Sequence, residues 1–539
     1  MDGIATHWPT RSFHALFLLL SSLAAASASP RPNVLFIAID DLRPELGCYG
    51  APHARTPHID ALAARGVRFT RAYCQEAICG PSRASLMTGL RPDRAGVVDN
   101  ETYFRDTVPA IVTLPEHFRR SGYETVYAGK IFHGRMTDDG RSWSRGATFP
   151  PGRAGMEYQR AENVELVKRR QQEAEAKYGP EARYGLGCGP ATEDADAPDS
   201  AYMDGRIAEA AILTLRDIKG RPFFLGVGFH KPHLPFVAPK KYWDLYDPAE
   251  IPLGPNPDPP QNATSLARHS SFELRTRADI PKSGPVDEAL ARRLRHGYLA
   301  CASFADAQIG KVLAELDRLG LRENTIVMLW GDHGWHLGDL GIWGKATNYE
   351  IAARAPLIVA APSRKARGRA ADGLVEFIDM YPTLCELAGL PLPPHLDGRS
   401  FAPLLDDPTR PGKAAAITQF PSPALREWAA MPLSPGMRET FFGPLIGAAE
   451  SRLAVEFRDA WSRDRFERHV MGYAVRTDRH RMIRWVDVRE PDSALASELY
   501  DHQTDPHETT NIAPDPASTQ LLQELTRLIP QPPKPGTQP

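Results

Sequence analysis

Residues 33–41 read NVLFIAIDD, an apolar run that ends in Asp40 and Asp41. A run of this kind, without polar alternation, is typical of a central strand of a parallel sheet that is buried on both faces. Three later runs share the pattern: Tyr123 to Ala128, Pro222 to Phe229 and Thr325 to Trp330. We therefore expect these four strands to form the centre of a mostly parallel sheet.

Helical patterns alternate with these strands along the chain. Thr56 to Gly66 starts with a capping Thr and a Pro at its first position and ends in Gly, and Thr113 to Gly122 repeats this order. Further helices are predicted at Ala161 to Tyr178, Ala208 to Ile218 and Asp287 to Leu319. The alternation predicts an α/β fold in which helices cover both faces of the sheet.

At 539 residues the chain fits one large domain with a smaller appendage. Thr137 to Pro198 is predicted to be a surface insertion, and Ile251 to Thr264 a long loop that forms one wall of a substrate cleft. From about Ser400 the elements become shorter, and Tyr473 to Asp487 has the pattern of a hairpin. We expect a large α/β domain over 29–400, a smaller α+β domain over 401–529 and a Pro-rich tail over 530–539.

The first residues have the features of an export signal. Arg11 precedes an apolar run from Phe13 to Ala26, and Ala26-Ser27-Ala28 forms a cleavage site. The run is too short to span a bilayer as a helix, with an uncleaved anchor as the alternative. We expect removal of residues 1–28 and a mature protein without a membrane anchor. It would be periplasmic or secreted in a bacterium and would follow the secretory or lysosomal route in a eukaryote.

The composition excludes two classes of protein. The chain carries 64 basic and 66 acidic residues, whereas a nucleic-acid binder would show a basic excess. Six cysteines are too few for a disulfide framework in a chain of this length, and their spacing is not that of a zinc site. Any anion-binding site must therefore be local.

Charged residues follow two of the predicted strands. Asp40 and Asp41 come after the first run, and Asp332 and His333 come just after Thr325 to Trp330. In open α/β sheets, ligands bind beyond the carboxyl ends of the strands. An isolated Asp-Asp pair is more often a solvated turn or a helix cap. A third carboxylate beside the pair favours a cation, and hard oxygen ligands suit calcium or magnesium.

The stretch from Cys79 to Gly89, CGPSRASLMTG, combines a Cys with Arg83. If a helix begins here, Arg83 lies one turn from Cys79 on the same face. Most isolated pairs of this kind are a buried free Cys beside a surface Arg. A phosphatase loop is excluded, because it would need Arg at the position of Ser85.

Further basic residues follow the other strands. Lys130 and His133 come after Tyr123 to Ala128, His230 and His233 close the run that ends at Phe229, and Lys345 stands in Trp343-Gly344-Lys345. Lone lysines are nearly always solvated, and a pair of histidines can belong to an ordinary loop. These residues acquire a functional interpretation only in combination with Cys79 and the acidic residues.

Taken together, these motifs resemble the type I sulfatases. The shared motifs are C-x-P-S-R with a following T-G at Cys79, G-K-x-x-H at Lys130 and H-x-P-H at His230. Within that family the chain is similar to the iduronate-2-sulfatase branch, with coverage from about Pro32 to about Ala513. The stretches that carry this second likeness are Asp40 to Gly50, Gly228 to His233, Met471 to Thr477, Glu498 to Asp501 and Thr504 to Glu508.

The resemblance implies an alkaline-phosphatase-like fold, a sulfuric ester hydrolase and a catalytic role for the large domain. A maturation enzyme would oxidise Cys79 to formylglycine, whose hydrate attacks sulfur better than a thiol does. Calcium, one ion per chain, would be held by Asp40, Asp41, Cys79, Asp332 and His333. Arg83, Lys130 and Lys345 would hold the sulfate oxygens with the calcium.

The two histidines would move protons. By resemblance, His233 protonates the departing alcohol oxygen, and His133 takes a proton from the second hydroxyl of the formylglycine hydrate so that sulfate leaves. His230 and His336 are substrate-site candidates. His336 and Leu340 depart from the pattern of the family beside Lys345, a position that bears on the leaving group.

The branch that the chain resembles removes 2-O-sulfate from terminal uronic acids, which implies an exo-acting enzyme on a sulfated sugar. A uronate carboxylate needs a cation of its own, and the densest basic stretch contains Arg476, Arg479, Arg481 and Arg484. Strand alternation would send Arg479 and Arg481 to one face, over the pocket mouth. The stretch can equally be a solvated edge strand. Two other functions stay open: a formylglycine-dependent phosphonate monoester or phosphodiester hydrolase, and a non-catalytic glycan-binding relative.

Overall fold

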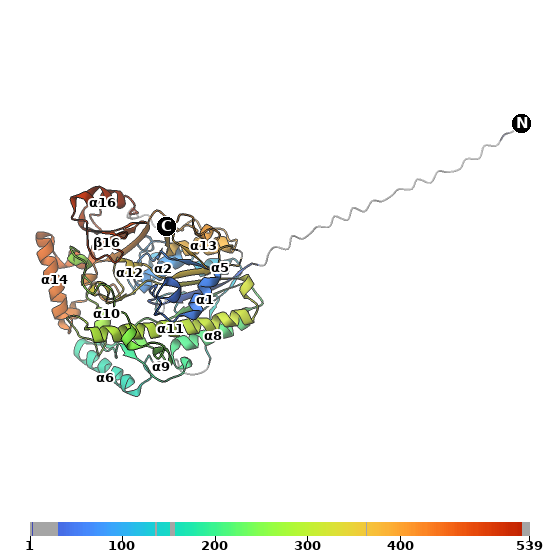
Figure 1. Cartoon of the computed structure of the whole chain (residues 1–539), viewed down its shortest axis with the longest axis horizontal. Helices are drawn as coiled ribbons and strands as arrows, with labels where there is room; N and C mark the ends of the chain where they lie inside the picture. The colour runs from blue at the N-terminus through green and yellow to red at the C-terminus, as the bar shows by residue number, and fades with distance from the viewer. Residues whose placement is uncertain (1–2, 4–30, 135–136, 151–156, 363, 531–539) are drawn as a thin grey trace.

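The computed structural model of the chain describes residues 3, 31–134, 137–150, 157–362 and 364–530 (Figure 1). The predicted signal peptide lies outside the described residues except for Gly3, and so does the Pro-rich tail beyond Pro530. Within the described part of the chain, no helix combines the length and the apolar character needed to cross a bilayer.

An eight-stranded sheet forms the centre of the protein, in the order β13-β2-β12-β9-β1-β7-β4-β5. The four predicted strands are confirmed as β1 (Asn33–Ile39), β4 (Glu124–Gly129), β7 (Phe223–Phe229) and β9 (Thr325–Gly331). β1 pairs in parallel with both β7 and β9, while β12 runs antiparallel to its two neighbours. The other strands are β2 (Val67–Phe69), β5 (Arg145–Gly146), β12 (Leu357–Ala360) and β13 (Arg369–Ala371).

Helices cover both faces of this sheet (Figure 1). One face is packed by α1 (Pro57–Arg65), α8 (Met203–Ile218) and α11 (Glu288–Arg318), and the other by α2 (Cys79–Thr88), α5 (Leu114–Arg120) and α13 (Met380–Leu387). Side chains of β1 alternate between the two cores, with Leu35 and Ile37 in the first and Val34 and Phe36 in the second. Each fully buried side chain of this size stabilises the fold by about 1.5–3 kcal/mol.

The predicted helices are confirmed, and the prediction for Ala161–Tyr178 (α6) agrees at both ends. α6 lies at the periphery, and Ala174 is its one buried residue. With α7 (Ala182–Leu186), it belongs to the predicted insertion. Shorter helices of the main body are α3 (Pro92–Ala95), α4 (Phe104–Thr107), α9 (Lys240–Trp243), α10 (Phe272–Arg275) and α12 (Glu350–Ala353).

A smaller antiparallel sheet follows in the C-terminal part. Its strands are β15 (Ala416–Pro421), β16 (Val470–Arg476), β17 (His480–Asp487) and β18 (Ala494–Asp501), in that spatial order. β16 and β17 are the predicted hairpin. The remaining helices here are α14 (Gly443–Phe457), α15 (Arg463–Arg468) and α16 (Thr519–Thr526). The boundary at 400 stays a prediction.

Buried ion pairs join the smaller sheet to the main body. The carboxylate of Glu350, at the start of α12, accepts hydrogen bonds from Arg481 at 2.6 Å and from Arg476 at 3.1 Å. Arg481 also forms an ion pair with Glu508 at 2.7 Å. Because the Arg481 side chain is fully buried, each partner is needed to compensate a charge that water cannot reach.

We expect Arg481→Ala to lower the free energy of unfolding by about 3 kcal/mol or more, since it leaves Glu350 and Glu508 short of a buried cation. Arg479→Ala is the matched control, because Arg479 is exposed and pairs with Asp501 at the surface. Urea denaturation followed by tryptophan fluorescence measures both. Equal losses in the two variants would contradict the prediction.

Candidate active site

The carboxyl ends of β1 and β9 bring three aspartates together. The amide of Asp40 donates to the carbonyl of Phe229 at 3.1 Å, and that of Asp41 donates to Oδ1 of Asp332 at 3.0 Å. Asp41 has a φ of 58°, in the left-handed region that Asp tolerates better than most side chains. The parallel register therefore converts residues far apart in sequence into one cluster.

This cluster fits a divalent cation. Asp40, Asp41 and Asp332 offer carboxylate oxygens that lie within 4.8 Å of one another, and each residue is at most 1% exposed. Burial raises the pKa of Asp41 well above its usual range, and the neighbouring Asp40 adds to the shift. A hard cation would relieve this repulsion. The oxygen donors suit calcium, as predicted, and equally suit magnesium.

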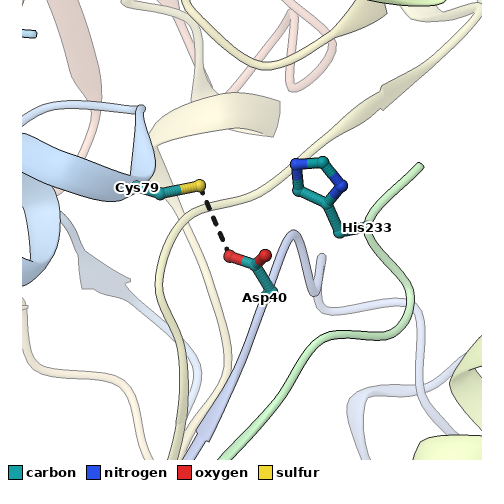
Figure 2. A group of neighbouring side chains, drawn as sticks. All are labelled: Asp40, Cys79 and His233. Carbon is teal, nitrogen blue, oxygen red and sulfur yellow. Dashed lines mark hydrogen bonds between the residues drawn. The ribbon is translucent and has the colours of Figure 1, made fainter. Parts of the chain in front are cut away.

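Cys79 is the first residue of α2, whose residues are all buried. Its Sγ lies 3.3 Å from Oδ1 of Asp40 and 3.3 Å from Nε2 of His333. Figure 2 shows that Asp40 lies between Cys79 and His233. Burial raises the pKa of the Cys79 thiol well above its usual value, and Asp40 contributes. An unmodified Cys79 is therefore protonated at neutral pH and is a poor nucleophile.

Three cations surround the carboxylates. Nζ of Lys130 donates to Asp40 at 2.6 Å, and Nζ of Lys345 donates to Asp41 at 2.8 Å and lies 3.6 Å from Sγ of Cys79. Arg83 is fully buried. Its guanidinium donates to Asp332, Asp40 and two backbone carbonyls and so holds the carboxylates in place, and its predicted contact with the sulfate stays a prediction.

Close backbone packing fixes the position of Lys130. Its amide donates to the carbonyl of Gly228 on β7 at 2.9 Å. A Cβ at Gly228 would lie 1.9 Å from the carbonyl oxygen of Lys130, and Gly129 has a φ of +81°. Only glycine fits both positions, so two glycines bring the Lys130 backbone against β7.

Hydrogen bonds orient the predicted histidines. Nδ1 of His333 donates to the carbonyl of Gly334 at 2.9 Å, which leaves Nε2 free to act as a metal ligand. Nδ1 of His233 donates to the carbonyl of Leu234 at 2.6 Å, and its Nε2 lies 3.3 Å from Glu273. Nδ1 of His133 is buried without a hydrogen-bond partner among the described residues. Burial, with Lys130 nearby, lowers the pKa of His133 to about 3.

His230 lies beside the cluster. Burial lowers the pKa of His230 to about 4, and the positive charge of Lys130 adds to this shift. Its backbone amide donates to the buried carboxylate of Asp204, as does that of Lys231, both at 2.8 Å. Asp204 therefore fixes the turn that carries His230 and His233.

Three predicted substrate residues are placed differently. His336 is fully buried and is held by Thr347 and the carbonyl of Asp339. The prediction that Arg479 and Arg481 share one face of a strand is wrong, because Arg479 lies in the turn before β17. Arg479 binds Asp501, and Arg481 is enclosed by Glu350 and Glu508, so neither guanidinium reaches the cluster.

Glu273 lies in the site, although no sequence pattern predicts it. Its carboxylate is 3.3 Å from Nε2 of His233 and 3.6 Å from Nζ of Lys345. Glu273 belongs to the four-residue helix α10, between the buried Phe272 and Leu274. A single polar residue in so short a helix is indistinguishable from a solvated one in the sequence alone.

The chain is similar to known proteins over most of its length. Residues 32–390 match the Sulfatase family model. The chain is 33% identical over 590 residues to iduronate 2-sulfatase from Mus musculus, which covers 96% of this chain and 98% of that protein. A relative this similar over nearly its full length shows that the likeness extends beyond the motifs.

Two solved structures share the fold. A phosphonate monoester hydrolase from Silicibacter pomeroyi superposes with a TM-score of 0.66 at 24% identity, over 92% of this chain and 94% of that one. A protein solved in complex with its substrate D-glucosamine-2-N,6-O-disulfate gives a TM-score of 0.67 at 20% identity, over 92% and 96%. The alkaline-phosphatase-like fold is thereby confirmed.

We expect Asp332→Asn to weaken calcium binding by at least about tenfold, because the change removes one of the three negative charges of the cluster. Isothermal titration of the purified protein with calcium measures the affinity. Asp372→Asn, at an exposed acidic residue outside the cluster, is the control and should bind calcium like the unchanged protein. Equal affinities in both variants would place the metal elsewhere.

Proposed function

Because the chain belongs to the sulfatase family and is a sulfuric ester hydrolase, we propose that it removes sulfate from a sulfated sugar through formylglycine made from Cys79. We further propose that it is exo-acting, with 2-O-sulfated uronic acids, as in glycosaminoglycans, as the preferred substrates. The observation that carries the proposal is the convergence of Cys79, Lys130, Lys345 and His233 on three buried carboxylates. The 33% identity to iduronate 2-sulfatase over 96% of this chain supports the choice of sugar.

In this proposal, calcium is held by Asp40, Asp41, Asp332 and His333 together with the modified residue 79. When bound, the ion polarises the sulfate oxygens as a Lewis acid. Lys130 and Lys345 supply the ammonium groups nearest to residue 79, where negative charge on the sulfate oxygens needs stabilisation. Both lysines are anchored by carboxylates of the cluster, which restrict their side chains before substrate arrives.

Residue 79 needs chemistry that the thiol does not provide. The raised pKa of Cys79 keeps it protonated, so conversion by an oxidising maturation enzyme is the proposed route to a nucleophile. The hydrated aldehyde so formed offers two geminal hydroxyls in place of one thiol. The start of a buried helix holds this residue in one position.

In this proposal the two histidines transfer protons at different stages of the reaction. Nε2 of His233 lies 3.9 Å from Asp41 and 3.3 Å from Glu273, and the proposed role of His233 is to deliver a proton to the leaving oxygen through this atom. Burial lowers the pKa of His233 well below its usual value, so the proton has to reach Nε2 during the reaction. The lowered pKa of His133 keeps it neutral, so it can accept a proton from a hydroxyl of residue 79.

The export of the protein is also proposed. The leader at 1–28 supports it, and export in turn requires that the maturation enzyme acts on the chain before or during secretion.

We expect the peptide that contains Cys79 to be about 18 Da lighter than its sequence mass when the protein is made in its native host, since an aldehyde replaces the thiol. Cys79→Ala should abolish turnover, because no hydroxyl or thiol remains to attack. Intact-peptide mass spectrometry and a panel of defined sulfated oligosaccharides measure the two effects.

An unmodified Cys79 in fully active protein would refute the formylglycine mechanism. Turnover of an aryl phosphonate faster than an aryl sulfate would favour the phosphonate hydrolase alternative. Binding of sulfated oligosaccharides without desulfation would favour the glycan-binding alternative.

A further inference from the structure

A narrow cleft opens beside Lys345. Three segments line it: the loop and helix from His269 to Glu273, the turn from Gly344 to Ala346, and the stretch from Phe420 to Trp428. The first segment holds Glu273, which contacts His233, and the second holds Lys345, which is proposed to be catalytic. The third comes from the C-terminal part of the chain, so the cleft joins the catalytic cluster to a distant segment.

Arg426 is a cation of this cleft without a charged partner among the described residues. Its Nη1 donates to the carbonyl of Ala430 at 3.2 Å, and its Nε is buried without an acceptor. Among the residues that the structure describes, no carboxylate lies within ion-pair distance of Arg426. Burial lowers the pKa of Arg426 to about 10, and the nearby carboxyl groups, Glu76 foremost, oppose this shift.

Two of the three acidic groups near Arg426 are occupied by other donors. Within the described part of the chain the third, Glu76, is buried with neither carboxylate oxygen hydrogen-bonded and lies beyond ion-pair distance of Arg426. Asp99 accepts from the backbone amides of residues 101 and 102, and Glu467 pairs with Arg438. Glu427, also in the cleft, accepts from the amide of Ser434 at 2.8 Å. A guanidinium presents five donors in a planar fork. Most of the N–H donors of Arg426 have no acceptor among the described residues and are available to a ligand.

His269 provides a neutral donor on the opposite wall. The amide of Ser271 donates to Nδ1 of His269 at 2.9 Å, so in the neutral ring the hydrogen is on Nε2. Burial lowers the pKa of His269 to about 3, and His336 contributes, which keeps the ring neutral. The backbone of Gly344 packs closely against the His269 ring, because a Cβ at Gly344 would lie 3.1 Å from Cε1 of His269.

We propose that Arg426 binds the carboxylate that a uronic acid substrate carries in addition to its sulfate, and that Nε2 of His269 donates to a hydroxyl of the same sugar. The inference rests on the proposed desulfation at residue 79. The planar fork of Arg matches a carboxylate bidentately, whereas Lys130 and Lys345 are point charges suited to sulfate. Arg426 thereby takes the role that the sequence assigned to Arg479 and Arg481.

A carboxylate is favoured over a second sulfate on geometric grounds. Lys345 and Arg426 line the same narrow cleft, so in this proposal the second anion lies on the sugar that carries the reacting sulfate. The carboxylate of a uronic acid is attached directly to the ring and needs no flexible linker. A second sulfate ester would use the same donors, and the experiment separates the two anions.

The test compares three substrates with unchanged protein and with Arg426→Gln: a 2-O-sulfated uronic acid glycoside, its carboxyl methyl ester, and 4-nitrophenyl sulfate. In the unchanged protein the free acid should have a KM about tenfold to a hundredfold lower than its ester, the range expected for a charge-assisted pair. Arg426→Gln should raise KM for the free acid by a similar factor, with a smaller change in kcat. For the ester and the aryl sulfate, KM of Arg426→Gln should stay within about twofold of the value for the unchanged protein.

Arg426→Lys should recover part of the preference, since it restores the charge without the fork. Arg479→Gln is the matched control at a surface arginine and should preserve all three activities. Equal losses on all substrates, or no preference of the unchanged protein for the free acid, would overturn the proposal. A disulfated sugar without a carboxylate, assayed as a fourth substrate, separates the two anions: a loss confined to that substrate would also overturn the proposal. If the unchanged protein turns over none of the sulfate esters, the proposed function itself fails.

Discussion

The structure depends on one electrostatic constraint, the burial of three carboxylates at the ends of two adjacent parallel strands. Asp40, Asp41 and Asp332 are almost fully removed from water. Burying each of these charges without a partner would cost several kcal/mol. Arg83, Lys130 and Lys345 meet them at hydrogen-bond distance. Three elements carry these cations: α2, the turn after β4 and the turn at Gly344.

This balance explains how one cluster can serve both a metal and a sulfate. A carboxylate has about four lone-pair sites, so a single aspartate can accept from a lysine and still face a metal ion. Oδ2 of Asp40 binds Lys130, while its Oδ1 lies on the side of Cys79 and Arg83. The cations therefore hold the acids in place, and the acids orient the ammonium groups toward residue 79.

The sequence predicted those parts of the protein that local patterns determine. Apolar runs specified four central strands, and capping residues specified α1 and α5, because these signals depend on neighbours in the chain. The cluster of three aspartates was also predictable, since parallel strands place their carboxyl ends at one edge. Glu273 was not, because its role depends on contacts with His233 and Lys345 that form only in the folded protein.

The arginines of the C-terminal part show why residue type alone misleads. The density of arginine near residue 480 favoured a carboxylate site there, yet the turn from Thr477 to His480 leaves Arg479 outside β17. Arg481 has two buried carboxylates as partners, so its charge is already compensated within the protein. Arg426 has no other arginine close to it in the sequence, and the one acceptor of its guanidinium among the described residues is a backbone carbonyl. A buried cation becomes a candidate for binding an anion when its partners are missing, and partners are a property of the fold.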